Sequence, residues 1–331
     1  MRQTRDFPHA KNENRLTVQL HRLLLASVGT SAFLLLACVP ASEEPGSSSA
    51  VDYSVGTHVV LLGTGTPNAD PERSGPAVAV IVNGTPYLVD AGPGVVRRTA
   101  AANAAGVKPL SVGNLRHLFL THLHSDHTVG LPDVIFTPWV LERDVPLQLY
   151  GPSGSLRMVE HLLEAWEEDI QVRLRGLEPA NDYGYQVDVH EIEPGLVFED
   201  GNVKVTAIPV HHGDWEEAYG FRFESADRVV VISGDATPSD ALVEACGGCD
   251  VLVHEVYSQV RFEQRPPMWQ RYHADSHTST VQLAELAERA RPRLLVLYHQ
   301  LFWGATEEEM FAEITASYDG VVISGRDLDV Y

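Results

Sequence analysis

The chain has 331 residues, of which 44% are hydrophobic and 21% are charged, so it can bury a large core. Its formal net charge at pH 7 is −21, from 45 acidic residues and 24 Lys or Arg residues. This acidity disfavours a tightly held polyanion such as RNA, because contacts to phosphates dominate the affinity for nucleic acids. The body of the chain holds no apolar run that predicts a transmembrane helix.

The N-terminal segment has the features of an export signal. Five Lys or Arg residues and two acidic residues precede an apolar stretch from Leu23 to Ala37. That stretch has the length of a signal h-region and is too short to span a bilayer comfortably. It ends in Leu35-Leu36-Ala37-Cys38, which resembles the lipobox of bacterial lipoproteins and predicts lipidation of Cys38. An ordinary signal peptide or an uncleaved anchor is the alternative.

These features divide the chain into three parts. Residues 1–38 are the predicted signal peptide, residues 39–54 are a polar linker of low complexity, and the folded domain covers residues 55–331. The leader carries five basic and two acidic residues, so the rest of the chain has a net charge of −24. We expect the domain to be exported to the bacterial cell envelope, facing the periplasm and held at a membrane by its lipid.

Apolar runs and turn residues predict the elements of the folded domain in chain order. In the first half, the predicted strands are His58–Leu62, Ala77–Val82, Pro86–Val89, Leu118–Leu120 and Leu147–Leu149, and the predicted helices are Val95–Ala105 and Leu156–Glu168. In the second half, the strands are Val203–Pro209, Tyr219–Phe223, Val229–Ile232, Val251–Val253, Leu294–Tyr298 and Val321–Ser324, and the helices are Val281–Ala290 and Glu307–Ser317. Strands grouped with helices in both halves indicate an α/β protein.

The segment Thr121–His127 reads T-H-L-H-S-D-H and directly follows a short buried strand. Side chains two apart on an extended chain point the same way, so His122 and His124 can bind one metal ion. The chain then turns, which allows Asp126 and His127 to face a second ion. The segment therefore predicts a metal site at the end of a strand.

This H-x-H-x-D-H run resembles the signature of the metallo-β-lactamase superfamily. The resemblance implies a single domain with a four-layer αββα sandwich, two sheets face to face with helices outside. It also implies further ligands at the ends of later strands, namely His212, Asp235 and His299. His211 is the alternative to His212. Asp90, also at a strand end, is implied to orient the signature loop without binding metal.

The implied site holds two divalent ions. His122, His124 and His212 bind one ion, Asp126, His127 and His299 bind the other, and Asp235 bridges them. Nitrogen and oxygen ligands without thiolate suit Zn(II), with Mn(II) or Fe(II) as alternatives. Such a pair can hold a bridging hydroxide that attacks an ester. Asp126 can also take part in proton transfer.

Two further segments are similar to the ribonuclease Z group of this superfamily. Asp250–Tyr257 reads D-V-L-V-H-E-V-Y, and Ser276–Ala284 reads S-H-T-S-T-V-Q-L-A. The resemblance implies that His254, Glu255 and His277 lie near the metals and help to protonate the leaving oxygen. The alternative is that these histidines only pack or cap a helix.

The chain departs from ribonuclease Z where that group carries a basic arm for tRNA. Between Gly151 and Gly220 there are 15 acidic and 4 Lys or Arg residues. We therefore expect a phosphodiesterase or arylsulfatase-like hydrolase acting on a small phosphodiester or sulfate ester. The alternatives are a ribonuclease Z-like endonuclease, a lactonase- or β-lactamase-like acyl hydrolase, and an inactive metal-loaded binding protein. The expected partners are a small ester substrate and the membrane, and nucleic acid is disfavoured as a partner. A homodimer is a further possibility.

Aromatic residues near the predicted ligands favour a pocket for a compact, aryl-type substrate, although ordinary core packing explains them equally well. These residues are Trp215, Trp269, Tyr272, Phe302 and Trp303.

Cys246 and Cys249 form a C-x-x-C pair. A small structural disulfide at a helix end is the favoured interpretation in an oxidising compartment, ahead of free thiols and of redox catalysis.

Overall fold

The computed structural model describes residues 51–331, which form one compact unit. The predicted signal peptide, its Cys38 and nearly all of the predicted linker lie outside the described residues. Within the described part, no helix has both the length and the apolar character needed to cross a bilayer.

The first sheet has six strands in the order β1-β2-β3-β4-β5-β6. Their bounds are β1 Thr57–Gly63, β2 Ala77–Val82, β3 Thr85–Val89, β4 His117–Phe119, β5 Leu147–Gly151 and β6 Val187–Glu191. The strands from β1 to β3 pair antiparallel, and those from β3 to β6 pair parallel. The β2–β3 hairpin turns at Asn83 and Gly84, which both have positive φ, as a two-residue type I′ turn requires.

The second sheet has seven strands in the order β13-β12-β11-β10-β9-β8-β7. Their bounds are β7 Gly195–Glu199, β8 Val203–Pro209, β9 Tyr219–Ser225, β10 Val229–Ile232, β11 Val251–Tyr257, β12 Leu295–Leu301 and β13 Val322–Ser324. Strands β7 to β10 pair antiparallel and β10 to β13 pair parallel.

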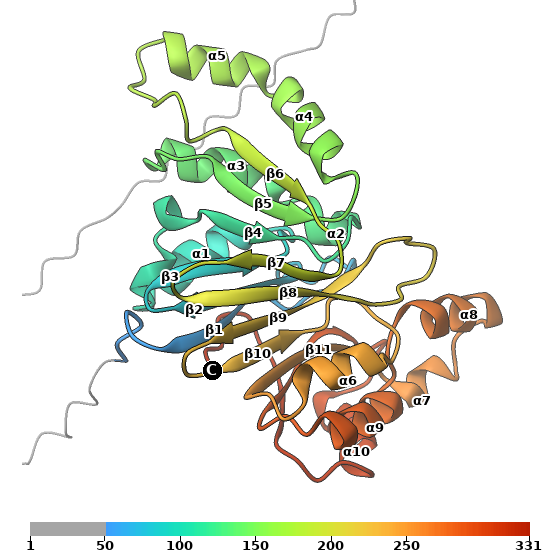
Figure 1. The fold of residues 1–331 in the computed structure, drawn as a ribbon. Coiled ribbons are helices and arrows are strands. Elements are labelled where there is room, and N and C mark those ends of the chain that lie inside the picture. Colours follow the sequence, from blue (N-terminus) through green and yellow to red (C-terminus); the bar gives the residue numbers. More distant parts are fainter. Residues whose placement is uncertain (1–50) are drawn as a thin grey trace, which may run out of the picture. The chain divides into compact units, whose positions relative to one another are not determined.

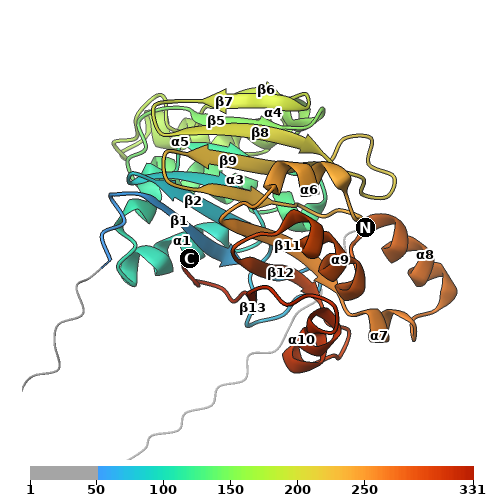
Figure 2. The same ribbon diagram turned by 60° about the horizontal axis from the view of Figure 1, so that its bottom comes forward.

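The two sheets lie face to face with helices on their outer surfaces (Figures 1 and 2). In β2, Val78 and Val80 belong to the apolar cluster between the sheets, whereas Ala79 and Ile81 belong to the cluster under the first helical layer. This alternation follows from the two-residue period of a strand, and burial on both faces explains the uninterrupted apolar runs. The structure is thus the four-layer αββα sandwich that the signature implied.

The helices of the first half are α1 Val95–Ala104, α2 Ser125–Thr128, α3 Leu131–Val140, α4 Ser155–Ala165 and α5 Glu167–Arg175, with short 3₁₀ helices at Lys108–Leu110 and Val112–Asn114. Those of the second half are α6 Asp240–Cys246, α7 Gln259–Phe262, α8 Pro267–Ser276, α9 Thr280–Ala290 and α10 Glu307–Thr315. Residues of α6, α9 and α10 form the third apolar cluster, on the outer face of the second sheet.

Several elements differ from the sequence-based expectations. The helix predicted over Leu156–Glu168 is two helices, because the backbone leaves helical geometry at Trp166. The edge strands β6 and β7 were not predicted, because half-exposed strands in an acidic stretch lack an apolar run. The short helices α3, α6 and α8 were also missed.

Candidate metal centre

The predicted metal ligands come together where strands of both sheets end. The signature loop follows β4, His212 follows β8, and Asp235 follows β10. Gly234 has a φ of 62°, and a Cβ at this position would meet the Thr121 side chain at 2.9 Å, so only glycine lets the two loops approach. His299 lies at a bulge in β12, with a φ of 43°, and this irregularity removes it from the strand ladder.

Three histidines form the first group of converging nitrogens. Nδ1 of His124 lies 3.0 Å from Nε2 of His122 and 3.1 Å from Nε2 of His212. Nδ1–H of His212 donates to the carbonyl of Ser276 at 2.6 Å, which leaves its Nε2 lone pair directed at the group. This arrangement is typical of a histidine prepared for metal binding.

The second group consists of Asp126, His127 and His299. Oδ2 of Asp126 lies 3.3 Å from Nε2 of His299 and 3.6 Å from Nε2 of His127. On the other side of the ring, Nδ1–H of His127 donates to Oδ2 of Asp90 at 2.8 Å. Oδ1 of Asp90 accepts the backbone N–H of Thr121 at 2.8 Å, so a single carboxylate orients both ends of the signature loop.

Asp235 lies between the two groups. Its Oδ2 atom is 3.5 Å from Nε2 of both His127 and His299, and 3.9 Å from Nε2 of His212. Its Oδ1 atom is buried without a hydrogen-bond partner. A carboxylate in this position can bind a cation on each side.

The protonation states favour cation binding. Burial lowers the pKa of His124 and of His212 to about 4, so both rings are neutral and offer lone pairs at pH 7. Burial alone would raise the pKa of Asp235, but His299 and His127 lower it well below its ordinary value, which keeps the carboxylate charged. Buried neutral imidazoles around buried carboxylates therefore fit one or two divalent cations.

Comparisons with known proteins agree with this geometry. Residues 85–300 match the family described as the beta-lactamase superfamily domain. A ribonuclease Z of Mycobacterium sp. (strain KMS) is 38% identical over 245 residues, which cover 73% of this chain and 84% of the relative. The chain belongs to the metallo-β-lactamase superfamily, in its ribonuclease Z branch.

Solved structures show the same fold. The metallo-β-lactamase fold protein YhfI from Bacillus subtilis has a TM-score of 0.65 at 16% identity, covering 83% of this chain and 99% of that one. The short form of human tRNase Z has a TM-score of 0.62 at 23% identity, covering 83% and 98%. This fold implies divalent metal binding, and the His and Asp groups of this superfamily member provide suitable ligands.

The structure separates His212 from its predicted alternative. His211 is exposed, and its Nε2 atom lies 3.0 Å from Oδ1 of Asp275 on the surface. It belongs to none of the metal-binding groups among residues 51–331. His212 is therefore the ligand candidate at this position.

Of the three residues expected to help protonate the leaving oxygen, two lie together beside the metal ligands and the third does not. Nδ1 of His277 lies 3.3 Å from Oε1 of Glu255 and 3.9 Å from Oδ2 of Asp235, so this pair adjoins the metal ligands. His254 is fully buried, and its Nδ1–H donates to the backbone carbonyl of Glu255 at 2.7 Å. It does not line the cavity that opens onto the ligands, and it belongs to none of the candidate metal-binding groups among residues 51–331.

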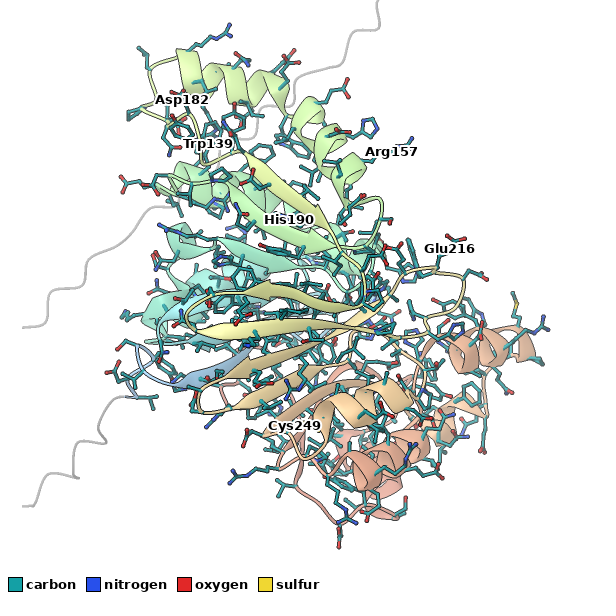
Figure 3. All side chains as sticks on the ribbon, in the orientation of Figure 1. Trp139, Arg157, Asp182, His190, Glu216 and Cys249 are labelled. Carbon is teal, nitrogen blue, oxygen red and sulfur yellow. A yellow bond between two sulfur atoms is a disulfide. The ribbon has the colours of Figure 1, made fainter. Side chains whose placement is uncertain are left out.

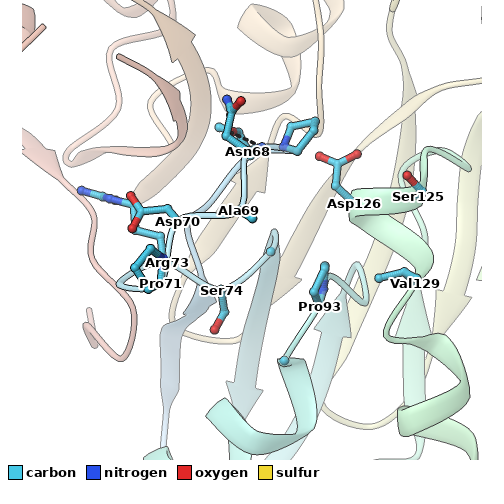
Figure 4. Close-up of a pocket in the computed structure, with 14 residues that line it drawn as sticks. Asn68, Ala69, Asp70, Pro71, Arg73, Ser74, Pro93, Ser125, Asp126 and Val129 are labelled. Carbon is cyan, nitrogen blue, oxygen red and sulfur yellow. Dashed lines mark hydrogen bonds between the residues drawn. The ribbon is translucent and has the colours of Figure 1, made fainter. Parts of the chain in front are cut away.

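A cavity of about 740 Å³ opens onto the ligands. It is lined by Pro67, Asn68, His124, Ser125, Asp126, Asp235, Arg265, Trp269, Tyr272, His273, His277, His299, Leu301 and Trp303. A second cavity of about 700 Å³ (Figure 4) shares Pro67, Asn68, Ser125 and Asp126 with the first. Asp126 therefore faces both cavities.

Three of the five predicted aromatic residues line the main cavity, and the other two lie outside both cavities. Trp269, Tyr272 and Trp303 line the main cavity, whereas Phe302 lies beneath the guanidinium of Arg73 at 5.2 Å. The indole N–H of Trp215 donates to Nε2 of His124 at 2.9 Å. Arg265 and His273 also line the main cavity, but they were not predicted as site residues, because they lie in a stretch without a recognisable motif.

Cys246 and Cys249 are joined in a disulfide at the end of α6, as predicted (Figure 3). Both residues are buried, which agrees with a structural role and not with redox catalysis.

Acid should destabilise the protein through His254. Burial lowers the pKa of this histidine to about 4, against about 6.5 for an unfolded chain. Below pH 6.5 the unfolded chain binds a proton that the folded chain does not, so this stability is present above pH 6.5 and is lost as the pH falls towards 4. We expect about 2–3 kcal/mol of the free energy of unfolding to be lost from this residue between pH 7.5 and 4.5.

Urea unfolding of chelator-treated protein at these pH values measures the loss. His254→Gln should flatten the pH dependence by that amount, whereas replacement of the exposed His161 should not change it. Parallel curves for the wild type and His254→Gln would contradict the prediction.

Proposed function

We propose that this chain is a metal-dependent phosphodiesterase of the ribonuclease Z type, which cleaves a P–O bond beside a nucleotide. The observation that carries this proposal is the position of the Glu255–His277 pair, 3.9 Å from the carboxylate shared by the two ligand groups. An acid beside a metal site serves the departure of a poor leaving group, which ribose oxygens are. The curated relatives, named ribonuclease Z, support the same chemistry.

This proposal reverses the order of the expectations drawn from the sequence. A small ester substrate was placed first and a ribonuclease Z-like endonuclease second, whereas the comparisons favour the endonuclease. No observation adds support for a sulfate ester or for an acyl substrate, so phosphorus is the proposed electrophile.

Divalent cations, which we propose to be zinc, supply Lewis-acid activation of water and neutralise charge at the phosphoryl group when bound. The chain's own residues perform the remaining tasks. Asp90 fixes His127, the Ser276 carbonyl fixes His212, and His277 with Glu255 delivers a proton to the departing oxygen. The water oxygen bonds to phosphorus, the bond from phosphorus to the leaving oxygen breaks, and that oxygen leaves as an alcohol.

A second candidate substrate is a small phosphodiester. The region that covers α4, α5, β6 and β7 is acidic, with 15 acidic and 4 Lys or Arg residues between Gly151 and Gly220. One of these acidic residues, Glu216, projects from the β8–β9 loop (Figure 3). A long RNA would gain little electrostatic attraction from such a surface.

Hydrolysis assays with the purified full-length, zinc-loaded chain test the proposal. The substrates are a tRNA precursor with a 3′ trailer, a dinucleotide, bis(p-nitrophenyl) phosphate, p-nitrophenyl sulfate and nitrocefin. Cleavage of the precursor supports the endonuclease, and cleavage of only the shorter diesters supports the second candidate. Turnover of the sulfate or of nitrocefin without any phosphodiester would overturn both.

We also propose that the chain is exported and lipid-anchored at Cys38. Fractionation of cells that express a Cys38→Ser variant tests this: the variant should leave the membrane fraction, and unchanged membrane association would contradict the anchor.

A further inference from the structure

One part of the lining of the main cavity differs in chemistry from the metal ligands. This part, which we call the aromatic wall, consists of Arg265, Trp269, His273 and Trp303. Among the residues that line the cavity, Asp126 and Asp235 supply the negative charges, and Arg265 is the one Lys or Arg. A permanent cation therefore lines the same cavity as the two carboxylates.

The guanidinium of Arg265 is held by ring faces. It lies 4.9 Å from the Trp303 ring centroid and 5.9 Å from that of Trp269, both within cation–π range. No carboxylate of residues 51–331 forms an ion pair with it, and its buried Nε atom has no hydrogen-bond partner. An arginine with free donors at the side of a cavity is suited to a phosphate.

Local contacts fix the backbone and ring positions of the aromatic wall. Arg265 precedes Pro266 and Pro267, which restrict its backbone, and its carbonyl accepts the side-chain N–H of Gln270 at 2.8 Å. Trp303 has a φ of 48°, a strained conformation for a bulky residue, and its ring lies 4.4 Å from that of His273. Strain of this kind persists where the surroundings enforce it, and it concentrates at functional sites.

The wall also adjoins the proposed acid. The His273 ring is 5.6 Å from that of His277, and the Trp269 ring stacks on His273 at 5.8 Å. Trp269 is 44% exposed, so part of its indole is accessible to a ligand. A group bound here is therefore next to the oxygen that His277 protonates, on the leaving-group side of the scissile bond.

We propose that the aromatic wall is a nucleotide subsite: the exposed part of Trp269 stacks a base, and Arg265, held by the Trp303 ring, binds the phosphate next to the scissile one. This inference rests on the proposed function, because it assigns the leaving group of that reaction. It makes the substrate at least a dinucleotide with a further phosphate, and it makes a simple alkyl phosphodiester a poor substrate.

Calorimetric titration tests the subsite without turnover. The full-length, zinc-loaded chain is titrated with AMP, with ribose 5-phosphate and with inorganic phosphate. Base stacking should make AMP bind about tenfold to a hundredfold more tightly than ribose 5-phosphate. Trp269→Leu should reduce this preference, and Arg265→Gln should weaken the binding of AMP by about tenfold or more. Trp303→Leu, which removes the ring that holds Arg265, should weaken the binding of AMP and of ribose 5-phosphate alike. Thermal melting reports whether each variant is folded.

Matched controls separate the wall from general effects. Arg271→Gln changes an exposed arginine on α8, the helix that carries Trp269, and Trp166→Leu removes an exposed tryptophan outside the cavity; both should bind AMP as the wild type does. Equal affinities for AMP and ribose 5-phosphate, or folded Trp269→Leu and Arg265→Gln variants with unchanged AMP binding, would overturn the subsite. A clear AMP preference in a chain that cleaves no phosphodiester would instead overturn the proposed function and leave the subsite standing.

Discussion

Asp235→Asn should reduce kcat for every phosphodiester by at least about 10²–10³-fold, the cost of removing one preorganised charged group from such a site. The carboxylate is 3% exposed and lies within 3.9 Å of His127, His212, His277 and His299. An amide of the same shape has no negative charge and cannot hold two cations. The buried histidines that now face the carboxylate would remain without their counterion.

Inductively coupled plasma mass spectrometry of the same samples measures whether loss of bound metal causes the fall in kcat. The variant should retain less than the wild-type metal content, whereas Asp240→Asn, which changes an exposed carboxylate on α6, should keep both metal and activity. Wild-type metal content together with wild-type kcat in Asp235→Asn would refute the bridging role.

His277→Asn should distinguish substrates by their leaving groups. A general acid contributes about 10²–10⁴-fold when the leaving oxygen must be protonated. We therefore expect cleavage of a dinucleotide to fall by that factor, and cleavage of bis(p-nitrophenyl) phosphate to fall far less, because nitrophenolate leaves without a proton.

The ionisation of the pair supports this role. Burial, reinforced by Asp235, raises the pKa of Glu255 well above its ordinary value, whereas burial lowers the pKa of His277 to about 4. These opposite shifts favour a protonated Glu255 beside a neutral His277, 3.3 Å apart, so the pair can share one proton. His211→Asn is the matched control, since His211 lies outside the ligand groups. Equal losses with both substrates would assign His277 to metal binding or packing.

The candidate metal ligands could be named from the sequence because they lie in or shortly after short strands and match the motif order of the superfamily. His122 and Asp235 follow the largely buried strands β4 and β10, whereas β8, before His212, alternates between buried and exposed residues. Parallel strands then present their carboxyl ends at one edge, which brings distant ligands together. The disulfide could also be predicted, because two cysteines only three residues apart in sequence can form a local disulfide or remain free thiols.

Trp269 and Trp303 were named from the sequence as pocket aromatics, but Arg265 and His273 of the aromatic wall could not be predicted, because their contacts depend on tertiary packing. Arg265 and Trp303 are far apart in sequence, and neither belongs to a periodic or motif-bearing segment. His254 is the opposite case, a residue that a sequence motif suggested for the site but that does not line the cavity. It shares a motif with Glu255, but alternation along β11 turns its ring away from the cavity that His277 lines. Adjacent residues on one strand face opposite layers, and only one of them reaches the site.

The left-handed backbone at His299, with a φ of 43°, and at Asp90, with a φ of 63°, has a consequence for engineering. Such conformations cost on the order of 1–3 kcal/mol each for residues other than glycine. Glycine would relieve this cost at both positions while removing a metal ligand or the residue that orients one. Laboratory evolution for heat tolerance and selection for turnover therefore act in opposite directions at positions 90 and 299, so libraries for thermal robustness should leave these two codons fixed.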